Sequence, residues 1–270
     1  MRKLKRSEEP EKLITNRNSL TEEYKKTNKP VWRKKYITET LFESSFGKCA
    51  YCGVSLNYRE QVPNFEMDEE KQMDIKIEIH ENNFLHIDHF IARKYDESKV
   101  VDWENLIPAC PTCNYKKGAH DVLFKPIINP YKDDFREYFI FYNQFLIVKE
   151  NDKTPKGAET NKLFLYFERF PKICQKLNNS INDTLHIIQK DVEKAFDERN
   201  QGGYSTYNAI KEQIRKLITE TYRNSYSSIT ATILLNHPIY QKIKQKFKTE
   251  KCWTFNDLEK RLEEVKFNTK

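Results

Sequence analysis

Two pairs of cysteines with the same short spacing constrain this chain more than any other feature. Each pair has two residues between its cysteines, and the pairs lie far apart in the sequence, at Cys49/Cys52 and Cys110/Cys113. The spacing is typical of thiolate ligands that hold one zinc ion tetrahedrally. We therefore expect a structural Zn²⁺ that joins two distant segments of the chain.

We expect neither a membrane-spanning segment nor a signal peptide in this sequence, and this expectation bears on the redox state of the cysteines. No apolar run approaches the roughly 20 residues that span a bilayer. The basic start, MRKLKR, is followed by no signal-peptide hydrophobic stretch. We therefore expect a cytoplasmic protein without a membrane partner, whose six cysteines stay reduced rather than forming disulfides.

Charge is distributed unevenly along the 270 residues, which carry a formal net charge of +7. Residues 1–35 hold 12 Lys and Arg against 5 acidic residues, and residues 131–270 hold 25 against 19. Residues 60–81 are the reverse, with 2 against 8. A basic start and a basic second half suit a polyanionic partner such as nucleic acid, although Lys-rich surfaces can also serve only to keep helices soluble.

Hydrophobic periodicity predicts an α+β chain in three parts. We expect a basic N-terminal arm with little structure of its own at 1–30, a zinc-containing domain at 31–130, and a mainly helical region at 131–270. Residues 54–82 are acidic and poorly periodic and look like an insertion. The expected elements are a helix at 31–46, strands at 83–91 and 103–109, a short helix from Cys110, a hairpin near Phe139 and Phe145, and helices at roughly 160–177, 183–200, 205–223, 228–247 and 256–266.

Polar residues between and after the cysteine pairs indicate chemistry beyond a zinc staple. Asp88 and His89 are adjacent in the first predicted strand, Asn105 follows, and Asn114 directly follows the last cysteine. Hydrolysis of a phosphodiester needs a base that is neutral near pH 7, and histidine suits that role. It also needs a hard cation, which oxygen ligands such as Asp88 and Asn114 can hold. A purely structural zinc ribbon is the alternative.

This order of residues, CxxC, then DH, then N, then CxxCN, resembles the HNH, or ββα-metal, nuclease superfamily over about residues 44–120. The resemblance implies that His89 is the general base and that Asn105 holds the loop that aims it. It also implies that Asp88 and Asn114 bind a catalytic Mg²⁺ or Mn²⁺. The four cysteines would then hold the structural Zn²⁺.

Four further side chains are candidates for binding the metal or the phosphates. His86 lies two residues before Asp88 and so shares its face of the strand, where it could join the metal or contact phosphate. Arg93 and Lys94 closely follow the histidine strand, and Lys117, like Lys116, lies on the predicted ligand helix. Any of these side chains could also be ordinary surface residues.

A closer resemblance extends along the whole chain and implies partners. The opening MRKLKR, the segment GKCAYCG, the block HIDHFIARK and the long helical tail are similar to the HNH subunits, known as the PtuB family, of Septu-type and retron-associated antiphage systems. That similarity implies an endonuclease acting with an SMC-like ATPase of the PtuA type, and in some systems with a retron reverse transcriptase and its RNA. The substrate would be DNA, with RNA such as tRNA as the other option. The alternative is a zinc-stapled module that binds nucleic acid without cutting it.

Overall fold

Two compact units make up the computed structural model of this chain, which describes residues 3–67, 73–142, 145–149, 154–198, 204–223, 225–250 and 252–269. Unit 2 spans Leu4–Phe124, and unit 1 contains Lys125–Lys270 together with the first three residues. The fold class is α+β, as the sequence predicts. The boundary falls at residue 124 rather than 130, because the segment after α3 packs with the helical unit.

The elements of unit 2 surround a small two-stranded sheet. Strand β3 pairs antiparallel with β4, from His86 opposite Ala109 to His89 opposite Leu106, and helix α3 follows directly. This is the strand, strand, helix order expected from the sequence. In chain order the unit contains α1 (Glu11–Thr27), η1 (Val31–Arg33), α2 (Lys35–Ser44), β1 (Asn57–Met67), β2 (Met73–Asn83), β3 (His86–His89), η2 (Glu97–Lys99), η3 (Trp103–Asn105), β4 (Leu106–Ala109) and α3 (Pro111–Lys117).

The N-terminal segment is not an arm with little structure, and that prediction is wrong. Residues 11–27 form α1, and its buried residues Leu13, Leu20 and Tyr24 recur at helical spacing along one face. They join a hydrophobic core with Trp32 and Ile37. The apolar positions are too sparse among the charges to stand out in the sequence, yet the helix that they form packs into the core of unit 2.

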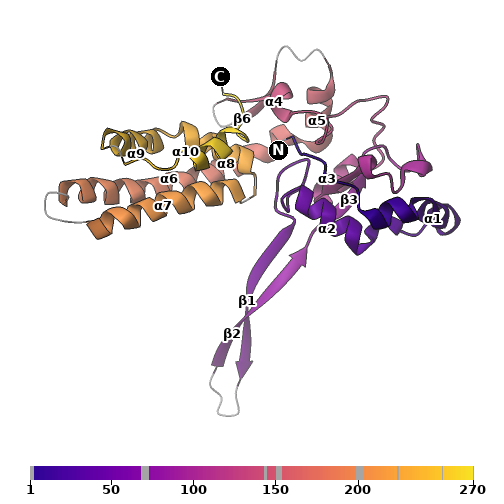
Figure 1. Cartoon of the computed structure of the whole chain (residues 1–270), viewed down its shortest axis with the longest axis horizontal. Coiled ribbons are helices and arrows are strands. Elements are labelled where there is room, and N and C mark those ends of the chain that lie inside the picture. Colours follow the sequence, from indigo (N-terminus) through magenta and orange to yellow (C-terminus); the bar gives the residue numbers. More distant parts are fainter. Residues whose placement is uncertain are drawn as a thin grey trace. The chain divides into compact units, whose positions relative to one another are not determined.

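The acidic insertion is also more regular than the sequence suggests. Strands β1 and β2 pair antiparallel along their full length, from Asn57 opposite Asn83 to Met67 opposite Met73. They form a two-stranded ribbon that extends away from the rest of its unit (Figure 1). The backbone returns to the core where Phe84 N donates to Leu56 O at 2.8 Å.

Unit 1 combines the predicted hairpin with a bundle of helices. Strands β5 and β6 pair antiparallel, which confirms the hairpin. Helices α6 to α10 pack together beside it (Figure 1). The elements are α4 (Phe135–Tyr138), β5 (Phe139–Tyr142), β6 (Phe145–Val148), α5 (Lys156–Phe164), α6 (Tyr166–Glu198), α7 (Tyr204–Arg223), α8 (Ser227–Asn236), α9 (Pro238–Thr249) and α10 (Asn256–Glu263).

Two prolines, Pro171 and Pro238, fall within the helices predicted at 160–177 and 228–247, and they behave differently. Helix α6 continues through Pro171, so the two helices predicted at 160–177 and 183–200 are largely one. Pro238 instead starts α9, where His237 accepts a hydrogen bond from Ile239 N; the first turn of a helix tolerates proline because its N–H has no helical partner there. Among the described residues, no helix is long and apolar enough to cross a membrane.

Candidate active site

The four predicted zinc ligands lie together and their geometry fits one ion. Their sulfur atoms all lie within 4.8 Å of one another, and the Sγ atoms of Cys52 and Cys110 are 3.8 Å apart. Four thiolates about 2.3 Å from a tetrahedral zinc are separated by roughly this distance. The first pair follows a turn in which Gly47 has a φ of 65°, and Cys110 is the N-cap of α3.

Electrostatics in this cluster also favours a bound cation. All four cysteines are buried, and burial raises the pKa of the Cys49 thiol well above its usual range. Ionisation of a buried thiol such as that of Cys49 is therefore unfavourable unless a positive charge offsets its cost. Zinc provides that charge when it binds thiolates, and so the cluster is suited to a metal and not to free thiols.

His89 is held at the end of β3 in a defined tautomer. Its Nε2 lies 2.8 Å from the carbonyl oxygen of Val100, and because a carbonyl can only accept, Nε2 carries the hydrogen. The neutral ring then has its unprotonated nitrogen at Nδ1. The edge of Trp32 packs against the imidazole at a centroid distance of 4.7 Å and an angle of 90°.

The pKa of His89 is lowered, and this favours the neutral form of the imidazole ring. The side chain is buried, with 6% of the residue exposed. Burial lowers the pKa of His89 to about 4, and the positive charges of Arg93 and Lys117 act in the same direction. The bond to Val100 opposes this shift only in part. At neutral pH the ring is therefore uncharged and able to accept a proton.

Asn105 ties together the loop between His89 and η3. Its side-chain oxygen accepts from Ile91 N at 2.7 Å, and its Nδ2 donates to the carbonyl oxygens of Ile91 and Lys99 at 3.1 Å each. Val100, the partner of His89, directly follows Lys99. The position of Asn105 thus fits the loop-holding role that the resemblance implies.

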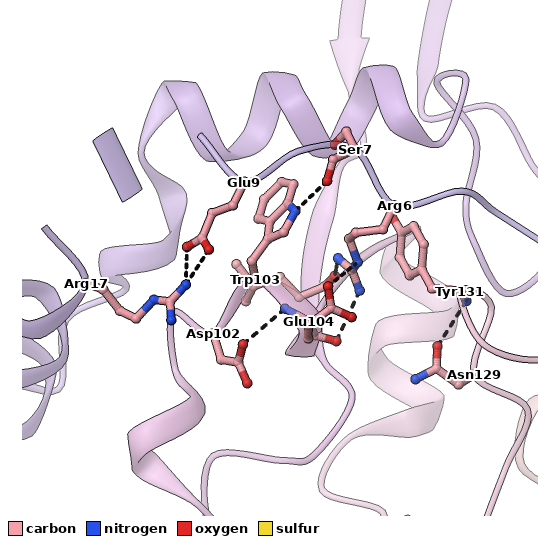
Figure 2. A network of polar contacts seen from close by, with 10 residues as sticks. Arg6, Ser7, Glu9, Arg17, Asp102, Trp103, Glu104, Asn129 and Tyr131 are labelled. Atoms are coloured by element: carbon pink, nitrogen blue, oxygen red, sulfur yellow. Dashed lines mark hydrogen bonds and ion pairs between the residues drawn. The ribbon is translucent and has the colours of Figure 1, made fainter. Parts of the chain in front are cut away.

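The first residues of unit 2, Arg6 and Ser7, form a strap that contacts Trp103 and Glu104 (Figure 2). These two residues directly precede Asn105. Arg6 donates to the carbonyl oxygens of Leu106 at 2.7 Å and Glu104 at 3.1 Å, and its guanidinium lies over the ring of Trp103. In return, Trp103 Nε1 donates to Ser7 O at 3.0 Å. These contacts hold the backbone on both sides of Asn105.

Asp88 borders the same cavity as His89, but its side chain is almost wholly buried. Only 4% of the residue is exposed; Tyr51 donates its hydroxyl to Oδ2 at 2.6 Å, and Nζ of Lys117 lies 3.3 Å from Oδ1. Burial raises the pKa of Asp88 to about 6, against the opposing effects of Lys117 and Tyr51. Both carboxylate oxygens are therefore already engaged inside the protein.

Lys117 cannot contact a nucleic-acid backbone in this structure, which contradicts the phosphate-binding option for it. Its side chain is 0% exposed, and Nζ donates to the carbonyl oxygen of His89 at 2.7 Å. The helical position of Lys117, one turn after Asn114, turns it toward β3 and not toward solvent. It contacts β3 from inside the protein.

His86 and Asn114 meet at the surface between β3 and α3. The Nδ2 atom of Asn114 lies 3.2 Å from Nδ1 of His86, and His86 is exposed. Because amide oxygen and nitrogen are interchangeable by rotation of the side chain, Asn114 can present either atom to the same point. The pair therefore offers a nitrogen and an oxygen ligand side by side.

One cavity joins most of these candidates. It has a volume of about 1100 Å³ and is bordered by His86, His89 and Asn114. Arg93 also borders it; its guanidinium lies over Trp32 at 4.5 Å and donates to the hydroxyl of Tyr24 at 3.3 Å. Lys94 lies at the same wall, with Nζ over the ring of Tyr95 at 4.5 Å. A phosphate group is small enough to enter this space.

Sequence reasoning missed the aromatic residues that organise the site. Trp32 contacts both His89 and Arg93, Tyr24 contacts Arg93, and Tyr51 contacts Asp88. Only Tyr51 carried a signal, because a bulky residue between two zinc ligands must point away from the ion. Tyr24 belongs to the segment at 1–30 that we expected to lie outside the domain. Trp32 lies in the helix predicted at 31–46, where no spacing in the sequence marked it as a site residue.

Comparison with known proteins agrees with this geometry. Residues 74–120 match the HNH endonuclease family, so the chain contains an HNH endonuclease domain. The chain is also similar to the Septu protein PtuB of Bacillus thuringiensis, with 28% identity over 245 residues, which cover 90% of this chain and 85% of that protein. No solved structure gave a significant match to this chain.

Proposed function

We propose that this chain, which is built around an HNH endonuclease domain, hydrolyses nucleic-acid phosphodiester bonds with His89 as the general base. The observation that carries the proposal is the bond between His89 Nε2 and Val100 O. It leaves Nδ1 as the proton acceptor of a neutral ring at the wall of a cavity bordered by cationic side chains. A module that only binds nucleic acid has no need of a histidine held in this way.

The residues of this chain divide the work of hydrolysis among them. Nδ1 of His89 would take the proton from an attacking water, and the Val100 carbonyl would stabilise the imidazolium that results. Asn105 keeps that carbonyl in place through its bond to Lys99. Arg93, whose guanidinium lies over the ring of Trp32, would bind the phosphate next to the attacked bond, and Lys94 would add positive charge at the same wall.

Two kinds of metal fit this site to different extents. The four cysteines fit a structural Zn²⁺, and Asn114 fits as an oxygen ligand of a catalytic Mg²⁺ or Mn²⁺. When bound, such a cation stabilises the charge on the leaving oxygen. Asp88 fits poorly as its second ligand, because Tyr51 and Lys117 already engage the carboxylate.

The similarity to the Septu protein PtuB supports a role in antiphage defence. On that basis we propose that the nuclease acts with an SMC-like ATPase of the PtuA type, with or without a retron reverse transcriptase. The helical unit is the part available to bind the ATPase, because the candidate catalytic residues all lie in unit 2. DNA is the proposed substrate. Co-expression with an ATPase encoded beside this chain, followed by failure to co-purify, would contradict the partnership.

A cleavage assay tests the nuclease proposal. Purified complex is incubated with plasmid DNA and, in parallel, with tRNA, in the presence of Mg²⁺ or Mn²⁺. We expect nicking or cutting by the wild-type protein and a loss of about 10²–10⁴-fold in His89→Ala, because removal of a general base has effects of this size. Nucleic-acid affinity and zinc content should stay nearly unchanged, since a base acts mainly in the transition state.

Raising the Mn²⁺ concentration distinguishes the loss of a general base from the loss of a metal ligand. Higher Mn²⁺ should partly restore Asn114→Ala, which has lost affinity for the cation, and should not restore His89→Ala. Near-normal cleavage by His89→Ala would remove the mechanism. Binding without cleavage by the wild-type complex on every substrate would favour the binding module instead.

A further inference from the structure

The cavity beside His89 has a wall that lies outside the segment matched to the HNH endonuclease family. The match covers residues 74–120, yet the cavity is also bordered by Lys25 in the last turn of α1 and by Trp32 and Arg33 in η1. These elements belong to the same compact unit as the candidate catalytic residues. The wall is therefore an addition of this chain to the matched domain.

Trp32 fixes this wall against the catalytic residues. Its indole meets the His89 imidazole edge-on at a centroid distance of 4.7 Å, and the Arg93 guanidinium lies over it at 4.5 Å. Val31 is buried as well, with 2% of the residue exposed. The two residues before Arg33 thus anchor its backbone in the hydrophobic core of unit 2.

The Arg33 side chain is free to bind a ligand. Arg33 is exposed and borders the cavity, and within the described part of the chain its guanidinium forms no ion pair and no hydrogen bond. Successive residues of a 3-10 helix point about 120° apart, because the helix has three residues per turn. Arg33 therefore leaves η1 in a different direction from Trp32, over which Arg93 lies. The two guanidinium groups can bind different phosphates.

The balance of charge in the cavity favours a polyanion. Among the described residues, its border carries four cationic side chains, Lys25, Arg33, Arg93 and Lys94, and two carboxylates, Asp88 and Glu97. The Asp88 carboxylate is already paired with Lys117. Lys25 is paired with Glu22 at 2.9 Å, with both side chains partly exposed, and such surface pairs are weak enough for a phosphate to compete.

The size of the cavity suits a segment of a strand better than a single phosphate. Its volume is about 1100 Å³, and pockets of about 300–1,000 Å³ enclose whole drug-sized ligands. A phosphate under attack at His89 would therefore leave room for the next phosphate of the same strand. Arg33 offers a planar, forked donor that matches phosphate geometry.

We propose that η1 and the last turn of α1 form a phosphate-binding wall, in which Arg33 binds the nucleic-acid backbone at a phosphate beside the attacked one. The inference rests on the proposed nuclease function and adds a binding residue to that site. Lys25 makes a weaker contact, because Glu22 already offsets its charge. Tyr24 and Trp32 are buried, with 7% and 8% exposed, so the wall offers no open ring for base stacking. It therefore contacts the backbone without reading the base sequence.

Binding of DNA to a protein that cannot cleave it tests the wall. The parent protein is full-length, zinc-loaded His89→Ala, and the probe is a short fluorescent DNA duplex titrated at several salt concentrations, with a second duplex of unrelated sequence in parallel. We expect Arg33→Ala in this parent to weaken binding about tenfold on both duplexes, as loss of a charged hydrogen bond does. The slope of log affinity against log salt should fall by about one, because one phosphate contact is lost. Arg33→Lys should keep most of the slope, because it keeps the charge.

Lys34→Ala is the matched control. It removes a positive charge from the next residue, which is also exposed and is not among the residues that border the cavity. Its side chain makes no capping hydrogen bond at the start of α2, so folding should be unaffected. We expect binding within about twofold of the parent, because a charge outside the cavity acts on DNA only through screening solvent.

Three outcomes would overturn the proposal: an unchanged affinity in Arg33→Ala, equal effects of Arg33→Ala and Lys34→Ala, and no binding of either duplex by the parent. Because Arg33 is exposed, the melting temperature and zinc content of Arg33→Ala should match those of the parent, and these measurements exclude a folding defect. The titration involves no cleavage. It can therefore fail while the His89 cleavage test succeeds, and it can succeed while that test fails.

Discussion

Asp88 and His89 are neighbours in the chain, yet they lie in two pockets with different chemistry. Burial acts on both and favours the uncharged form of each, so the pKa of Asp88 rises and that of His89 falls. Around Asp88, the Lys117 ammonium and the Tyr51 hydroxyl favour the ionised carboxylate and so partly offset the effect of burial. In the His89 pocket, a carbonyl and the edge of an indole leave the ring neutral. One strand thus holds a carboxylate paired with an ammonium beside a neutral imidazole.

Loss of the proposed zinc should disrupt the surroundings of both Asp88 and His89 and is the largest effect that we expect. Zinc binding contributes folding free energy directly in sites of this kind, and Tyr51 lies between two of the ligands. Cys110→Ser should give poorly soluble protein without zinc. Elemental analysis and circular dichroism check this expectation. A soluble, folded Cys110→Ser protein without zinc would contradict it.

Lys117→Met removes the positive charge beside Asp88, together with the hydrogen bond from Nζ to the carbonyl oxygen of His89. The change keeps the side-chain volume but leaves a carboxylate buried without its cation, which should lower the free energy of unfolding by about 3–5 kcal/mol. Urea denaturation measures this loss, with Lys116→Met as the control from the same helix. In an Asp88→Asn background the cost of Lys117→Met should shrink, because no unpaired carboxylate remains. An equal cost in both backgrounds would show that Lys117 stabilises the fold without acting through Asp88.

Tyr51→Phe is a smaller change in the same pocket. It removes the hydroxyl that donates to Asp88 at 2.6 Å, and hydrogen bonds to charged groups contribute about 1.5–3 kcal/mol. We expect a loss of stability of this order with full zinc content. Because β3 is then held on one side only, turnover should fall while KM stays close to wild type. A stability equal to wild type would mean that the Tyr51 hydroxyl does not help to hold Asp88 in place.

The dependence of stability on pH should be small, because the two pockets oppose each other. The folded pKa of Asp88, about 6, lies above its ordinary 3.8, so its contribution is present below pH 3.8 and is lost as pH rises through 6. The folded pKa of His89, about 4, lies below its ordinary 6.5, so its contribution is present above pH 6.5 and is lost as pH falls through 4.

Melting temperatures between pH 4 and pH 6.5 can separate these two contributions. Asp88→Asn removes the group that gains stability as pH falls and leaves His89 unopposed. We therefore expect the melting temperature of Asp88→Asn to fall more steeply with decreasing pH than that of the wild-type protein. Parallel curves would show that the two pockets do not compensate each other.

Much of the site could be predicted from the sequence because its chemistry requires fixed residue types at fixed spacings. The zinc cysteines cluster as expected, and the HNH domain is confirmed. The orientation of Asp88 could not be predicted, because it depends on the tertiary contacts of Tyr51 and Lys117. Trp32 was missed for a related reason, since aromatic contacts across a core have no spacing rule in sequence.

Some elements of the fold could likewise be predicted from the sequence, and others could not. The hairpin near Phe139 and Phe145 and the predominance of helices in the second half followed from local periodicity. The helix at 11–27 did not, because many charged residues dilute its apolar stripe and its stability comes from packing on the rest of unit 2. The continuous course of α6 through Pro171 likewise depends on neighbours that the local pattern does not contain.

The strap and the zinc cluster have a consequence for when the protein becomes active during its synthesis. Arg6 bonds to a carbonyl 100 residues away, and Cys52 meets a cysteine 58 residues away. Contacts of such long range make folding slow, since the intervening chain must be ordered first. A ribosome must also release Lys117 before β3 can be fixed. Under the proposed function, a nascent chain therefore gains nuclease activity only after the whole of unit 2 has emerged and folded.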